Sequence, residues 1–68
     1  MNVLLLKTYM KQFGDTQESL AQDFGLSVSR LNAKINARDA TFNLKEMAFI
    51  KERYRLTAEE LERIFFND

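Results

Sequence analysis

The stretch TQESLAQDFGLSVSRLNAKIN, residues 16–36, decides the fold of this 68-residue chain. Apolar residues recur at helical spacing on both sides of Gly25, which predicts two short helices. Gly25 suits the left-handed residue that ends a helix, and Ser27 suits the N-cap of the next one. A connection of only three residues forces two short helices to cross steeply, as in a helix-turn-helix unit. A plain corner in a helical bundle is the alternative that the spacing leaves open.

The rest of the chain adds three helices and has no strand pattern, so we expect an all-α fold of five short helices in one domain, residues 1–68. A helix over about residues 3–13 precedes Gly14, which suits a left-handed helix end. Asn43 and Thr57 can each cap a later helix, because a glutamate three residues on completes a capping box. The residues expected to face the core are Leu6, Tyr9, Met10, Phe13, Leu20, Ala21, Phe24, Leu31, Ile35, Leu44, Met47, Ile50, Tyr54, Leu61, Ile64 and Phe65.

The composition argues against several classes of function. Cysteine and histidine are both absent, so the chain has no disulfide framework and no Cys/His zinc site. The commonest general base at neutral pH is therefore missing, and a chain this short has little room for a deep pocket. We expect no enzyme, no metal and no cofactor. The apolar run at residues 3–6 is too short for a secretion signal or a membrane span, which favours a soluble intracellular protein.

Positive charge is concentrated in one short segment, although 10 basic and 10 acidic residues give a net charge of zero. Between residues 28 and 38 the only charges are Arg30, Lys34 and Arg38. Acidic residues dominate residues 15–23 and the C-terminal tail. A zero net charge by itself counts against nucleic-acid binding, but a local basic segment suits contact with phosphates.

The second helix of the pair, residues 28–36, has a core face and an outward face. At 100° per residue, Leu31 and Ile35 share one direction, and the opposite face carries small polar residues and amides. Such a face suits the major groove, because asparagine pairs with adenine, serine bonds several base edges and methyl groups meet thymine. Ordinary solvent-facing side chains are the alternative interpretation of the two amides. The residues expected to read bases are Ser27, Val28, Ser29, Asn32 and Ala33.

Phosphate contacts are expected on both sides of that helix. Gln17 opens the preceding helix, whose N-terminal N–H groups can face an anion. Arg30 and Lys34 form one basic flank at a spacing of four residues. Contacts of this kind fix the register of a protein on the duplex without reading the sequence. The residues expected to contact the DNA backbone are Gln17, Arg30, Lys34, Asn36, Arg38 and Asn43.

Two phenylalanines lie off the predicted core stripes. Phe49 falls outside the apolar stripe of its helix, and Phe66 lies at the edge of the stripe of the last helix. Apolar side chains that a core does not need can form a contact between proteins. We therefore expect Phe49 and Phe66 to contribute to an association patch.

An ordered set of residues resembles the XRE/Cro-repressor type of helix-turn-helix, and is similar to small phage Cro-like regulators of Gram-positive bacteria. The resemblance covers about residues 3–66, nearly the whole chain. It is carried by Thr16-Gln17-Glu18-Ser19-Leu20-Ala21, Phe24-Gly25-Leu26-Ser27, Leu31-Asn32-Ala33-Lys34-Ile35-Asn36, Phe42, Met47, Ile50, Leu56-Thr57 and Ile64-Phe65-Phe66.

The resemblance implies a lambda-repressor-like domain that forms a homodimer on a palindromic double-stranded DNA operator. It further implies transcriptional control of a phage switch in the cytoplasm and nucleoid of the host, without a cofactor. Gln17 and Asn36 would then contact the DNA backbone, and residues 27–33 would face the bases. Ala37 departs from the family, which usually has Gly there, and a left-handed backbone would cost alanine about 1–2 kcal/mol. The alternative function is an antirepressor that binds a phage repressor protein in place of DNA, and the zero net charge favours it.

Overall fold

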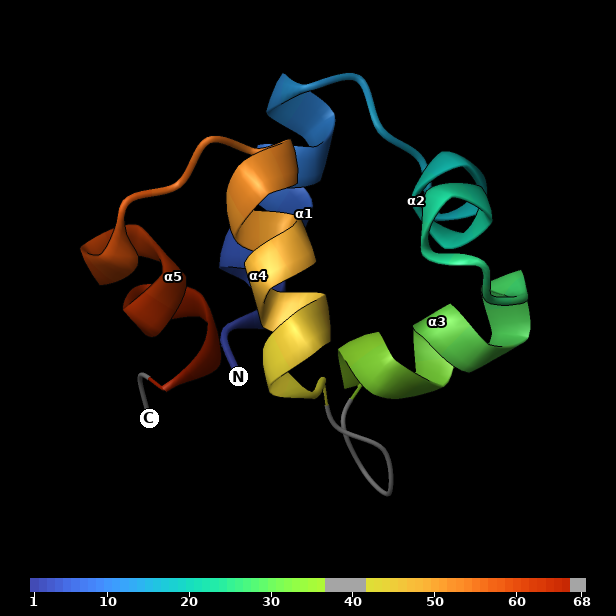
Figure 1. Ribbon diagram of the computed structural model, residues 1–68. Helices are drawn as coiled ribbons and strands as arrows, with labels where there is room; N and C mark the ends of the chain where they lie inside the picture. The colour runs from blue at the N-terminus through green and yellow to red at the C-terminus, as the bar shows by residue number, and fades with distance from the viewer. Residues whose placement is uncertain (37–41, 67–68) are drawn as a thin grey trace.

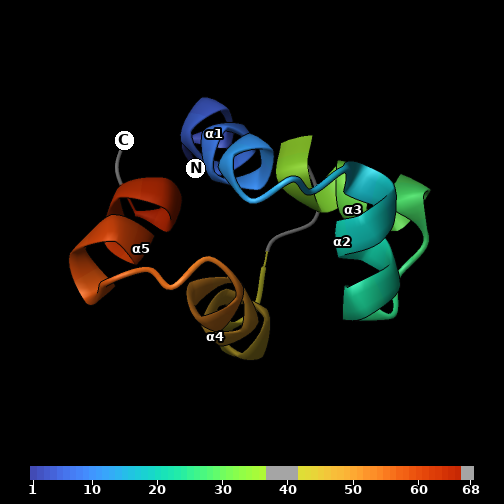
Figure 2. The ribbon, with the colours of Figure 1, turned by 90° about the horizontal axis from the view of Figure 1, so that it is seen from above.

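The computed structural model describes residues 1–36 and 42–66 of the chain. These residues form five α-helices and no strand, which confirms the expected all-α architecture for the described part of the chain. In both ribbon views α5 lies at one end of the molecule, α1 and α4 lie in the middle, and α2 and α3 lie at the other end (Figures 1 and 2). The helices are α1 Val3–Gln12, α2 Gln17–Phe24, α3 Val28–Asn36, α4 Leu44–Arg53 and α5 Ala58–Phe65.

The helix ends lie where the capping residues of the sequence place them. The side-chain oxygens of Asn43 and Thr57 each accept the backbone N–H of a glutamate three residues on, which closes both expected capping boxes. Thr16 forms a third capping box, in which Ser19 takes the place of the usual glutamate. Gly14 and Gly25 have φ of +72° and +76°, so each adopts the left-handed conformation expected after a helix.

The core takes at least one fully buried aliphatic side chain from every helix, namely Leu6, Leu20, Leu31, Ile35, Ile50 and Ile64. Phe42 lies before α4 and packs its ring 5.4 Å from that of Phe65 and 6.0 Å from that of Phe24. The backbone N–H of Asn2 donates to the carbonyl of Ile64 at 2.6 Å, which fastens the start of α1 to α5. Residues from both ends of the chain therefore close one hydrophobic core.

Two of the expected core residues lie outside it. Leu44 is 80% exposed, because as the first residue of α4 it projects beyond the end of the core. Phe42, just before the cap, is 5% exposed and covers this end of the core in its place. Phe13 is 46% exposed just after α1, where its ring and that of Tyr54 form an edge-to-face pair, 5.3 Å apart between centroids. The prediction was therefore wrong for Leu44 and only partly right for Phe13.

A single guanidinium fastens both ends of α2 to α4. Arg53 donates through Nε and Nη2 to the carboxylate of Asp15 at 2.8 and 2.7 Å, and through Nη1 to Asp23. Asp15 precedes α2, and Asp23 lies near its end. Tyr54 also donates its hydroxyl to Asp15 at 2.8 Å. The orientation of α2 is therefore set by charged bonds as well as by Leu20 and Ala21 in the core.

The electrostatics of this cluster favour its charged form. The hydrogen bond from Arg53 is the main cause that lowers the pKa of Asp15 to about 2, against the opposing effect of burial. Ser19 and Tyr54 lower it further by donating their hydroxyls to the same carboxylate. The pKa of Arg53 is raised in turn, chiefly by the hydrogen bond to Asp15. Asp15 and Arg53 are therefore ionised together across the whole physiological range.

Candidate nucleic-acid interface

The pair α2 and α3 has the steep crossing that the sequence predicts. Figure 1 views α2 almost along its axis, whereas α3 runs across the picture below it. Within the turn, the N–H of Leu26 donates to the carbonyl of Ala21 at 2.9 Å, and Gly25 donates to Gln22 at 3.2 Å. Ala21 itself is buried, so a small residue lies where the turn closes on α2. The turn therefore fixes the direction in which α3 leaves α2.

The expected division of α3 into two faces is confirmed. Leu31 and Ile35 are 0% exposed and fasten the helix to the core. The candidate base-reading residues are all exposed: Ser27, Val28, Ser29, Asn32 and Ala33. They are accessible to a partner, and whether they read bases stays a prediction.

Two hydrogen bonds order this surface. The hydroxyl of Ser27 accepts the backbone N–H of Arg30 at 3.2 Å and so caps the start of α3. Farther along α3, the side-chain amide nitrogen of Asn36 donates to the side-chain amide oxygen of Asn32, one turn before it. The oxygen of Asn32 keeps a second lone pair and its nitrogen keeps two N–H donors, which a two-pronged contact with adenine requires. The amide that suits base readout is therefore held in one orientation by its neighbour.

The surroundings of Lys34 differ from those expected of a residue that contacts phosphates. Its ammonium lies 3.1 Å from the carboxylate of Glu46 and 5.9 Å from the centre of the Phe42 ring, and both ion-pair partners are partly buried. Glu46 belongs to the capping box of α4, so the lysine joins the last turn of α3 to the first turn of α4. Arg30 stays exposed. Arg30 and Lys34 therefore do not form the expected exposed basic flank, because the ion pair between Lys34 and Glu46 joins two helices.

The other residues expected to contact the DNA backbone differ in exposure and in hydrogen bonding. Gln17 is the first residue of α2 and is partly buried, whereas Asn36 ends α3 and is exposed. Asn43 is exposed too, but its side-chain oxygen already accepts the N–H of Glu46 at 2.8 Å. Arg38 lies outside the residues that the structure describes. Gln17, Arg30, Asn36 and Asn43 therefore stay predictions as backbone contacts.

The two residues of the expected association patch have different surroundings. The ring of Phe49 lies 4.7 Å from that of Phe24 and packs against the core, so the expectation that the core does not need Phe49 is wrong. The helical wheel missed this because the Phe24 partner comes from α2. Phe66 is 61% exposed. It stays the candidate residue for association.

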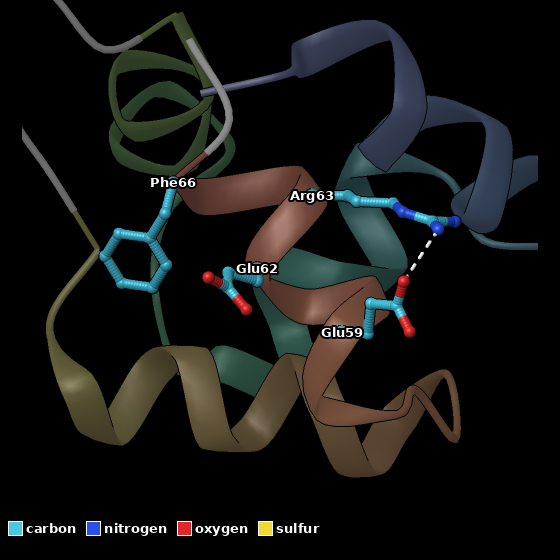
Figure 3. A pocket seen from close by; sticks show the side chains of 4 residues that line it. All are labelled: Glu59, Glu62, Arg63 and Phe66. Carbon is cyan, nitrogen blue, oxygen red and sulfur yellow. Dashed lines mark hydrogen bonds and ion pairs between the residues drawn. The ribbon is translucent and has the colours of Figure 1, made fainter.

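Phe66 lines a shallow depression of about 360 Å³ on α5, together with Glu59, Glu62 and Arg63. Figure 3 shows the Phe66 ring at one side of this depression and the paired Arg63 and Glu59 at the other, with the Glu62 carboxylate between them. The Arg63–Glu59 pair measures 2.9 Å and lies within one helix on the surface. An exposed pair of this kind adds little to stability.

The described residues, 1–36 and 42–66, include acidic side chains but neither histidine nor cysteine. In this part of the chain, no set of three or more Asp, Glu, His or Cys side chains gathers in a way that could hold a metal ion. None of the helices described there has both the length and the apolar character that crossing a membrane requires.

The chain matches no protein-family model, and searches of curated proteins and of solved structures returned no match. The exposed residues of α3 and its buried opposite face are therefore the observations that bear on function.

Proposed function

We propose that the protein binds double-stranded DNA by sequence, with α2 and α3 as a helix-turn-helix unit of the lambda-repressor-like type, and regulates transcription. The observation that carries the proposal is the outward face of α3. Its small polar side chains are exposed together, while Leu31 and Ile35 beneath them are fully buried. A helix fastened on one side and free on the other can enter a major groove, which is wide enough to admit it.

The residues on this face have the chemistry of base readout. Asn32 can donate to N7 and accept from N6 of one adenine. Val28 and Ala33 offer methyl groups to thymine, and Ser27 and Ser29 can bond several base edges. Because none of these side chains is long, the helix axis can lie deep in the groove.

Backbone contacts would set the register of the complex. Arg30 on the flank of α3 and Gln17 at the start of α2 would meet phosphates. Asn36 follows one turn after Asn32 and combines a contact to the backbone with its bond to that side chain. The resemblance to Cro-like phage regulators adds that the complex is a homodimer on a palindromic operator, in the cytoplasm of a bacterial host.

A second candidate function is an antirepressor, which binds a repressor protein in place of DNA. The observation that favours it is the small number of cations next to α3. The net charge of the chain is zero, and Lys34 is paired with Glu46. A surface with few cations obtains little from the release of counterions, which supplies most non-specific affinity for DNA.

Selection from random duplex DNA at about physiological salt, followed by a footprint on the enriched sequence, tests the proposal. We expect an enriched palindrome with a protected major groove in each half-site. In the enriched site, Asn32→Ala should relax discrimination at one base position by about 1–3 kcal/mol. An antirepressor would enrich no sequence, and its complex with a repressor would depend less steeply on salt.

A matched pair of charge insertions tests the placement of the interface. Ala33→Glu puts a carboxylate on the outward face of α3, and Ala48→Glu puts the same group on an exposed position of α4. Repulsion between like charges in an interface costs several kcal/mol, so Ala33→Glu should weaken binding by roughly 100-fold or more. Ala48→Glu should bind almost as the natural chain does. Equal effects of the two variants would place the interface elsewhere.

A further inference from the structure

A depression of about 250 Å³ lies where α1 meets the start of α2. Neither of the two lysines in it was expected from the sequence to contact DNA. Both are exposed, and they stand one turn apart on α1. The residues that line the depression are Lys7, Met10, Lys11, Asp15, Thr16 and Gln17.

The lining of this depression has a positive charge, because it holds two lysines and one acidic residue, Asp15, which is already paired. Both carboxylate oxygens of Asp15 accept from Arg53, at 2.7 and 2.8 Å, and Tyr54 donates to one of them as well. Arg53 on α4 therefore offsets part of the negative charge of Asp15, since the same guanidinium also pairs with Asp23. Glu18 is the other acid at the start of α2, and it does not line the depression. Lys7 and Lys11 are left as the charges that face outward.

The depression also lies beside the proposed interface. Figure 2 shows α1, the first turn of α2 and the last turn of α3 along one side of the molecule, with α4 on the opposite side. Gln17, a candidate backbone contact, is itself part of the lining. The start of α2 is a helix N-terminus whose N–H groups can face a phosphate, and it borders the depression.

We propose that Lys7 and Lys11 bind the sugar–phosphate backbone of the duplex whose groove takes α3, next to Gln17. The inference rests on the proposed DNA binding and extends it to a second element, α1. The two ammonium groups are point charges on flexible stems, so they bind phosphates whatever the sequence. They also supply positive charge that Lys34, paired with Glu46, was expected to supply.

The test compares the salt dependence of binding for three double variants and the natural chain, on a selected site and on unrelated duplex DNA. Lys7→Gln/Lys11→Gln removes both charges, and Lys7→Arg/Lys11→Arg keeps them. The control Lys51→Gln/Arg55→Gln removes the same net charge from exposed positions on α4 and just after it. All four positions in these variants are on the surface, and a thermal melt establishes that each variant is folded.

Each phosphate contact contributes about 0.9 to the slope of log affinity against log salt. We expect Lys7→Gln/Lys11→Gln to reduce the magnitude of the slope by roughly 1.8 on both DNAs, whereas the arginine variant and the control keep the natural slope. If the natural chain binds DNA and the glutamine variant has the same slope as the control, the inference is wrong and the proposed function stands. If the natural chain binds no duplex at all, both are wrong.

Discussion

Asp15→Asn tests the charged cluster that orients α2. Asparagine keeps the size of the side chain but removes the charge that binds two nitrogens of Arg53 and the hydroxyl of Tyr54. The cluster lowers the pKa of Asp15 from 3.8 to about 2, which corresponds to about 2 kcal/mol of stability at neutral pH. Because the side chain of Arg53 is still 20% exposed, screening reduces this contribution to about 1–2 kcal/mol.

The direction of the pKa shift determines how the stability contribution of Asp15 changes with pH. The pKa is lower in the folded chain, so the contribution is fully present above about pH 4, where Asp15 is ionised in both states. As the pH falls from 3.8 towards 2, the unfolded chain takes up the proton first, and the stabilisation is lost. The natural chain and Asp15→Asn should therefore differ by about 1–2 kcal/mol at pH 7 and converge near pH 2.

Urea unfolding at pH 7, 4, 3 and 2 measures this difference, in which the titration of all other groups cancels. Asp23→Asn is the matched control, since Asp23 pairs with the same guanidinium but its side chain is 53% exposed. Its effect at pH 7 should stay below about 1 kcal/mol. Equal stability of Asp15→Asn and the natural chain at pH 7 would refute the reasoning. So would a difference that persists unchanged to pH 2, because its cause would then be packing.

Three further predictions concern stability and are measured by urea or thermal unfolding. Ile35→Ala should cost about 2–5 kcal/mol, because the side chain is fully buried beneath α3, whereas Ile35→Val should cost about 1 kcal/mol. Thr57→Ala removes the oxygen that accepts the N–H of Glu60 at 3.1 Å and should cost about 1 kcal/mol, while Thr57→Ser should keep most of the stability. Arg55 has φ of +52°, so Arg55→Gly should stabilise the chain by about 1 kcal/mol; a loss of stability would mean that the arginine side chain outweighs the backbone strain.

The features that could be predicted from the sequence are the local ones. Asn43 and Thr57 were recognised as caps because both partners of each capping box lie within four residues. The exposed and buried faces of α3 followed from the helical period alone, since Leu31 and Ile35 stand one turn apart. The third capping box was missed, because Ser19 is not the glutamate or glutamine that the usual pattern requires.

The features that could not be predicted join residues far apart in the sequence. Arg53 binds Asp15 across 38 positions, and no local pattern links an arginine at the end of one helix to an acid before another. Lys34 was placed on a basic flank because its helix was considered alone, whereas Glu46 comes from the next helix. The depression around Lys7 and Lys11 likewise exists only because α1 and α2 meet there.

In the part of the chain that the structure describes, α3 is held by residues other than its outward side chains. Leu31 and Ile35 hold it from beneath, Lys34 ties its last turn to α4, and the Arg53 cluster fixes the helix that precedes it. None of these contacts uses the outward residues Ser29, Asn32 or Ala33. Exposed substitutions usually change stability by less than about 0.5 kcal/mol, so stability and DNA affinity should respond to different residues. A variant such as Asn32→Ala should therefore melt as the natural chain does and still lose discrimination between bases, whereas substitutions beneath α3 should affect both properties together.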